Sequence, residues 1–116
     1  MSISPLLDST IIFISNNDLR TRKLLHVIRR REVSRSVHWL RNLRQVERFF
    51  DNPLAFSKEP NHTVAIILDY DLEGVSLITR FLNDRDVLMH CTLFSLASVT
   101  EEVESFESQL RSAGHK

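Results

Sequence analysis

Two carboxylates separated by a single residue, Asp69 and Asp71, directly follow the apolar run 64–68. A short, unbroken apolar run is typical of a strand that is buried on both faces of a parallel sheet. In open sheets of this kind, functional groups collect outside the carboxyl ends of the strands, and Asp69 stands at such an end. An aspartate in that place can accept a phosphoryl group, bind a metal or act as a nucleophile. It can equally cap the turn that follows, and the pattern alone leaves both interpretations open.

A second chemical feature is the uneven distribution of charge. Between Leu19 and Phe50 there are ten Arg or Lys residues and two acids, whereas eleven acids and five bases follow from Asp51 onward. The formal net charge is nevertheless zero. A concentrated basic segment can bind nucleic acid or an acidic partner, or it can be a solvated helix face. The basic residues that fall on one predicted helix are Arg20, Arg22, Lys23, Arg29, Arg30 and Arg31.

The composition excludes several classes of function. Two glycines in 116 residues are too few for a glycine-rich phosphate loop or a dinucleotide fingerprint. The five histidines lack metal-ligand spacing, and the apolar runs are too short to span a membrane. The first eight residues lack the basic start and long apolar stretch of a signal peptide. The lone Cys91 cannot form an internal disulfide, and we expect it to be a small core residue in a protein of the reducing cytoplasm.

The elements that must position Asp69 alternate between strand and helix. Apolar runs predict strands over 10–14 and 64–68, a weaker edge strand over 33–40 and a fourth strand within 87–96. Apolar residues at helical spacing predict a helix after the capping residues 15–18, and helices over 43–50 and 75–82. One final helix is predicted from the capping-box pair Ser98 and Glu101 to Gly114, and 51–63 is predicted as a long loop. These elements predict a single α/β domain over 10–113, a lead-in over 1–9 and a tail over 114–116, with a three-layer parallel sheet and right-handed crossovers.

The order of these elements, together with Asp69, resembles the receiver domain of two-component response regulators, a CheY-like module with the flavodoxin-like fold. The segment 64–74 is similar to the family's apolar strand, phosphoacceptor aspartate, short loop and glycine, and it puts Asp69 at the acceptor position. Ser95, at the end of the fourth apolar run, matches the Thr or Ser with which the family senses the phosphoryl group. The resemblance extends over about residues 10–113 and implies the strand order 2-1-3-4.

Two departures from the family pattern shape the expected function. Where receivers carry two adjacent acids that hold Mg²⁺, this chain has Ser15 and Asn16, which contribute no charge. The family's fifth strand, which bears an essential lysine, and its fifth helix have no counterpart in the sequence. We therefore expect the fourth strand to be an open edge and part of the first helix to be uncovered. Dimerisation, docking on a partner and a fragment of a longer protein all remain open explanations.

The resemblance thus implies a degenerate receiver, or pseudo-receiver, that acts in signal transduction through protein–protein contacts, with little or no phosphorylation of Asp69 and no catalytic residue. The expected partners are a histidine kinase or a downstream signalling protein, and a second copy of the chain. We expect no resident cofactor, and only weak binding of Mg²⁺ by Asp69, Asp71 or Asp18. Three alternatives stay open: a phosphorylatable receiver in a phosphorelay, a nucleic-acid-binding module built on the basic helix, and a haloacid-dehalogenase-like phosphatase that uses the Asp-x-Asp spacing.

Overall fold

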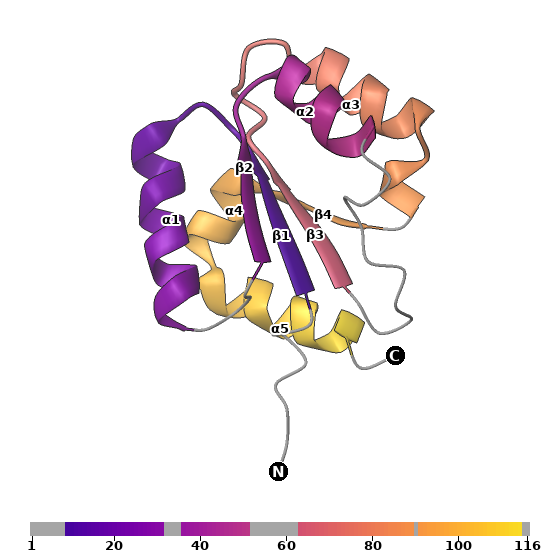
Figure 1. Ribbon diagram of the computed structural model, residues 1–116. Coiled ribbons are helices and arrows are strands. Elements are labelled where there is room, and N and C mark those ends of the chain that lie inside the picture. Colours follow the sequence, from indigo (N-terminus) through magenta and orange to yellow (C-terminus); the bar gives the residue numbers. More distant parts are fainter. Residues whose placement is uncertain (1–8, 32–35, 52–62, 90, 115–116) are drawn as a thin grey trace.

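The computed structural model describes residues 9–31, 36–51, 63–89 and 91–114, and it forms one parallel sheet between two layers of helices (Figure 1). The four strands are β1 (Ser9–Ile14), β2 (Ser36–Leu40), β3 (Thr63–Leu68) and β4 (Thr92–Ser95). All neighbouring strands are parallel, and their order is β2-β1-β3-β4. The predicted α/β class and strand order are therefore confirmed.

The register brings the carboxyl ends of all four strands to one rim of the sheet. Ile14 is the partner of both Leu40 and Leu68, and Leu68 is in turn the partner of Ser95. The residues that follow these positions consequently emerge side by side. The chain reverses its direction across the sheet after β2, so that β1 and β3 become neighbours, and this reversal point is where open α/β sheets place their functional groups.

The helices divide between the two faces of the sheet. α1 (Asp18–Arg30), α4 (Leu96–Glu101) and α5 (Val103–Gly114) cover one face, while α2 (Leu43–Asp51), α3 (Val75–Asp84) and the short 3₁₀ helix η2 (Val87–Met89) cover the other (Figure 1). Each strand alternates its side chains between the faces, as the pleat requires. In β1, for example, Ile11 and Phe13 face α1, whereas Ile12 and Ile14 face α2 and α3.

Local capping explains where the first and third helices begin. Asn17 is the N-cap of α1, and its side-chain oxygen accepts a hydrogen bond from the Arg20 backbone N–H at 3.1 Å. Thr21, Leu24 and Ile28 then form the buried side of α1, with the helical spacing from which this helix was predicted. Gly74 precedes α3 with φ of 79°, a left-handed conformation that glycine adopts without a steric cost.

The C-terminal part of the chain differs from the prediction. A single helix from Ser98 to Gly114 was expected, but α4 already begins at Leu96. The helix is then interrupted at Glu102, whose φ of −132° and ψ of 68° are not helical. The one-helix prediction was wrong because apolar residues spaced four, three and four apart fit an unbroken helix and a broken one equally well. Similarly, the fourth apolar run begins as the helix η2 and becomes a strand only at Thr92.

Part of α1 was expected to be uncovered, and Val27 does line an open groove between α1 and the C-terminal helices, whereas the buried side of α1 shares a core with those helices. Leu96, Val99 and Phe106 join α1 and the sheet in one apolar cluster, which we call the α1-face core. Phe106 is 2% exposed and packs edge to face on Phe94, with 4.8 Å between the ring centroids. The α4–α5 segment therefore covers the face of the sheet on which α1 lies. β4 remains an edge strand of the sheet that the structure describes.

Several predictions lie outside the described residues. They concern the lead-in 1–8, the start of the predicted edge strand at 33–35, most of the long loop at 52–62 and the last two residues of the tail. Among the helices in the described ranges, none has the length and apolar character that crossing a bilayer requires.

Candidate functional site

Asp69 lies at the carboxyl rim of the sheet, at the reversal point between β1 and β3. Its backbone N–H donates to the Ile14 carbonyl at 2.9 Å, which extends the pairing of β3 with β1 by one residue. Because Ile67 belongs to the α1-face core and the pleat alternates, the Asp69 side chain is directed to the α1 side of the sheet. The predicted placement of this carboxylate is therefore confirmed.

The Asp69 carboxylate is buried and holds a hydrogen bond on each oxygen. The residue is 4% exposed. The Ser15 hydroxyl donates to Oδ2 at 2.8 Å, and the backbone N–H of Asp71 donates to Oδ1 at 2.9 Å. Hydrogen bonds to a buried carboxylate are among the stronger ones in proteins, because they replace the solvation that the charge has lost.

Ser15 is the residue around which this site is organised. It is fully buried, and its Oγ accepts a hydrogen bond from the Asn17 backbone N–H at 3.0 Å while its own proton is donated to Asp69. Its backbone is fixed equally firmly, since Ser15 N–H donates to the Leu40 carbonyl at 3.0 Å and its carbonyl accepts from Trp39 Nε1 at 2.8 Å. Every polar group of Ser15 is thus engaged by β2, β3 or the start of α1.

Trp39 and Arg41 connect the end of β2 with the beginning of α1 through side-chain contacts. The Arg41 guanidinium carbon lies 3.8 Å from the centroid of the Trp39 ring, which is close cation–π stacking. Arg41 also forms a hydrogen-bonded ion pair with Asp18 in the first turn of α1. Our sequence reasoning did not assign Trp39 or Arg41 to the site. The sequence feature that could have identified them is an indole N–H donor and a cation at the end of the strand beside β1.

The other residues predicted for the site do not contact Asp69 through their side chains. Asp71 is exposed and contributes its backbone N–H, Asn16 is exposed, and the Asp18 carboxylate is paired with Arg41. Ser95 ends β4 beside Leu68 and is half-buried. Phe94 and Leu96 pack in the α1-face core while Leu93 packs on the opposite cluster, so alternation directs Ser95 away from the face that holds Asp69.

The donor set does not fit a resident Mg²⁺ ion. In the part of the chain that the structure describes, no three His, Cys, Asp or Glu side chains are grouped as a metal would need. The Ser15 hydroxyl donates its proton to Asp69, and its oxygen already accepts a hydrogen bond from the Asn17 backbone N–H. A divalent ion prefers carboxylate oxygens, and among the described residues the hydrogen bonds of this site involve the single carboxylate of Asp69, each oxygen of which already accepts one hydrogen bond.

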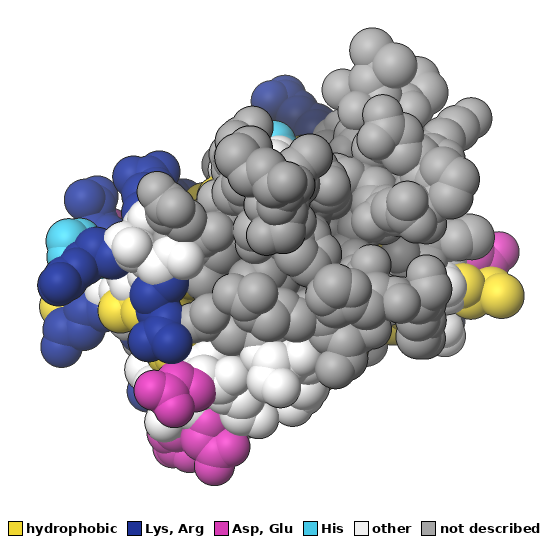
Figure 2. All heavy atoms as spheres, turned by 90° about the horizontal axis from the view of Figure 1, so that it is seen from below, with side chains coloured by type: hydrophobic (Ala, Val, Ile, Leu, Met, Phe, Trp, Pro, Cys, Tyr) yellow, Lys and Arg dark blue, Asp and Glu magenta, His cyan; other side chains and the backbone are white. Residues whose placement is uncertain are grey.

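The basic residues of α1 lie mostly on its solvent side. Arg22, Lys23, Arg29, Arg30 and Arg31 are exposed, and Arg20 is half-buried. Figure 2 shows the dark blue side chains gathered at one end of the molecule, with acidic side chains next to them. Arg22 also approaches the ring of Trp39, with 5.9 Å between its guanidinium carbon and the ring centroid. The same helix buries Thr21, Leu24 and Ile28, so it is at once a core element and a charged surface.

Cys91 has the character that was expected of a core thiol. It is partly buried against the cluster beneath α2 and α3. Burial raises the pKa of the Cys91 thiol from 9.0 to about 11, because the charged thiolate loses solvation there. The thiol is therefore protonated at neutral pH and is a poor nucleophile.

In comparisons with known proteins, no protein-family model, no curated protein and no solved structure matches the chain.

Proposed function

We propose that the protein is a degenerate receiver-like module that acts through protein–protein contacts, and that Asp69 is a structural carboxylate which is not phosphorylated. The observation that supports this most directly is the state of that side chain. It is 4% exposed, and its two oxygens accept hydrogen bonds from Ser15 and from the Asp71 backbone. A phosphoacceptor must instead present an accessible oxygen to its phosphodonor.

The electrostatics of the rim support the same proposal. Phosphoryl transfer proceeds by positioning and charge neutralisation, which metal ions and cationic side chains supply. Around Asp69 the structure places a neutral hydroxyl and a backbone amide, and the nearby cation Arg41 is already engaged by Asp18. Because neither described partner of Asp69 carries a positive charge that could offset the charge on an incoming phosphoryl group, we expect attack by Asp69 to be slow or absent.

The protein-contact part of the proposal is supported by what the rim offers to a partner. Two large apolar side chains are exposed on segments that take part in this rim: Leu19, which is 69% exposed, and Tyr70, which is 52% exposed. Leu19 belongs to the first turn of α1, and Tyr70 directly follows Asp69. Exposed apolar side chains next to a rigidly held rim are suited to contact with another protein, for which a histidine kinase or a downstream signalling protein is the expected class.

The test is incubation with acetyl phosphate and Mg²⁺, followed by intact-mass measurement, with a phosphorylatable receiver as the positive control. We expect no phosphoryl adduct on the wild-type chain under conditions that modify the control fully. Two matched variants, Asp69→Asn and Asp71→Asn, are measured in parallel. An adduct that forms on the wild type and on Asp71→Asn but not on Asp69→Asn would establish a working phosphoacceptor and overturn the proposal.

A further inference from the structure

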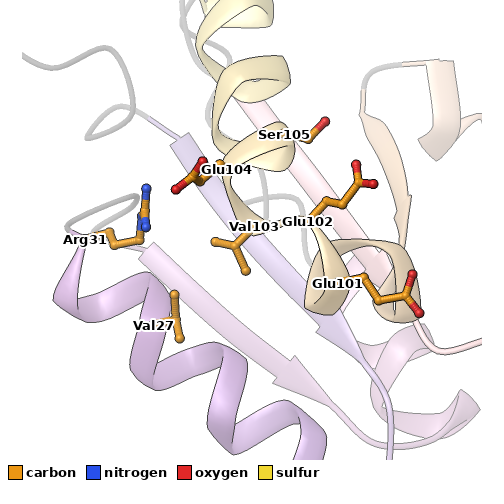
Figure 3. A pocket seen from close by; sticks show the side chains of 7 residues that line it. All are labelled: Val27, Arg31, Glu101, Glu102, Val103, Glu104 and Ser105. Atoms are coloured by element: carbon orange, nitrogen blue, oxygen red, sulfur yellow. The ribbon is translucent and has the colours of Figure 1, made fainter.

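A groove separates α1 from the α4–α5 segment on the outer surface of the α1 face (Figure 3). It has a volume of about 580 Å³. One wall is formed by Val27 of α1 and by Arg31, which caps the end of α1, and the other by residues 101–105 around the break between α4 and α5. Val27 and Val103 supply the apolar parts of the two walls, and charged residues surround them.

The α1 side of this groove carries a basic strip. Val27 lines the groove, and residues three, four or seven positions away share its side of a helix. Those positions hold the basic residues Arg20, Lys23, Arg30 and Arg31, and also Leu24, which is buried in the core. We define the basic strip by the first three of these, Arg20, Lys23 and Arg30; the remaining basic residues Arg22 and Arg29 lie farther around the helix toward Trp39, where Arg22 approaches the indole ring.

The opposite side of the groove carries an acidic strip, formed by Glu101, Glu102 and Glu104. All three are exposed, and all three line the groove. Glu104 extends toward the α1 side, whereas Glu101 and Glu102 extend away from it (Figure 3). Among the residues that the structure describes, these three carboxylates have no ion-pair partner. Basic residues of α1 and the three glutamates therefore lie on opposite sides of one groove without a described ion pair between them, and Figure 2 shows basic and acidic side chains next to one another at one end of the molecule.

We propose that this face is the interface of a homodimer, in which the two-fold axis lies in the interface plane and runs along the groove. A rotation about that axis exchanges the two sides of the groove, so the basic strip of one copy is placed over the acidic strip of the other, and the reverse. The face is thus complementary to itself, as a two-fold interface requires. A polyanion such as a nucleic acid would meet the three glutamates across the groove, which disfavours it as an occupant.

The dimer is expected to be weak and sensitive to salt. α1 has 13 residues, and a helix of that length is about 20 Å long. Two adjacent helices of this size offer an area at the low end of specific interfaces, where association is transient. The pairing is between exposed charges, which salt screens with a Debye length of about 10 Å at 0.1 M. The dimer does not depend on Asp69 phosphorylation, so its test is separate from that of the proposed function.

The experiment is sedimentation velocity of the full chain with two charge-reversed variants. One carries Glu101, Glu102 and Glu104→Lys, and the other carries Arg20, Lys23 and Arg30→Glu. We expect the wild type to dimerise at low salt and its dissociation constant to rise at least about tenfold between about 0.02 M and 0.5 M salt. Each variant alone should be monomeric, and an equimolar mixture of the two should form a heterodimer.

A matched control separates this interface from general attraction of opposite charges. Each substitution changes the charge by two, so the first variant has a net charge of +6. The control carries Glu47, Glu73 and Asp84→Lys, three exposed positions on or next to α2 and α3, and has the same net charge. It should dimerise like the wild type and should not pair with the basic-strip variant. A wild type that is monomeric at every salt concentration, or reversed variants that still homodimerise, would overturn the proposal, as would pairing of the control with the basic-strip variant.

Discussion

The hydrogen bond from Ser15 to Asp69 gives the most direct quantitative test of the candidate site. Replacing Ser15 by Ala removes the donor that lies 2.8 Å from Asp69 Oδ2 and leaves a 4% exposed carboxylate short of one partner. Hydrogen bonds to charged groups contribute about 1.5–3 kcal/mol, and an unsatisfied buried acceptor adds its own desolvation cost. The Asn17 N–H, which also loses its acceptor, is in an exposed residue that water can reach. We therefore expect the free energy of unfolding to fall by about 2–3 kcal/mol.

A double-mutant cycle with Asp69→Asn isolates the pairwise contribution. The amide keeps the shape of the carboxylate but removes its charge, so the Ser15 hydroxyl then donates to a neutral acceptor and contributes about 1 kcal/mol. The cost of Ser15→Ala should consequently be smaller by about 1–2 kcal/mol in the Asp69→Asn background. Equal costs in the two backgrounds would show that Ser15 and Asp69 are not coupled.

The measurement is urea unfolding followed by fluorescence, with far-ultraviolet circular dichroism as a second probe. Trp39 is the only tryptophan of the chain, and its indole N–H donates to the Ser15 carbonyl, so it reports on the site itself. Ser98→Ala, at an exposed position of α4, is the control and should change stability by less than about 0.5 kcal/mol. A cost for Ser15→Ala that is no larger than that of the control would refute the reasoning.

Three further predictions concern the rim, the C-terminal helix and the thiol. Ser15→Asp places a second carboxylate in a fully buried position beside Asp69 and should destabilise the protein by at least about 3 kcal/mol in metal-free buffer. Mg²⁺ should restore part of this lost stability. The absence of both effects in thermal melts would contradict the described contact between Ser15 and Asp69. Phe106→Ala should lower the free energy of unfolding by about 3–5 kcal/mol, because Phe106 is 2% exposed in the α1-face core; a loss below about 1 kcal/mol in urea unfolding would mean that α5 does not cover this face. Burial raises the pKa of the Cys91 thiol to about 11, so the unfolded chain, with its thiol near 9.0, ionises first as the pH rises, and stability that is complete below pH 9 should be lost progressively toward pH 11. Cys91→Ala should remove this part of the decline, and at pH 8 alkylation of the folded wild type should be at least about tenfold slower than that of the unfolded chain.

The fold could be predicted from the sequence because its main signals are local and redundant. The apolar runs of β1 and β3 are buried on both faces, and such runs have few interpretations other than the centre of a parallel sheet. The start of α1 carried its own capping signal at Asn17. The break at Glu102 could not be predicted in this way, because no glycine or proline marks it and the apolar spacing of the segment passes through it unchanged.

The candidate site could be predicted only in part. A run of apolar residues that ends in Asp69 is sufficient to place the carboxylate at the rim. The sequence interpretation of Ser15 considered only the charge that it lacks, whereas the structure shows what it contributes: a donor to Asp69 and an acceptor for Asn17. The side to which Ser95 points depends on the register of β4, and a shift by one residue would reverse it, which no pattern in the sequence determines.

The helical layers on the two faces of the sheet become complete at different stages of synthesis. The layer of α2 and α3 is built from residues 43–84, so it can close over its face as soon as β3 and the segment after it are made. The other layer joins α1 to Phe106, which come from opposite halves of the chain. Until translation has passed α5, a nascent chain therefore carries an incomplete sheet. The face under α2 and α3 is covered, whereas the other face is apolar and accessible to chaperones.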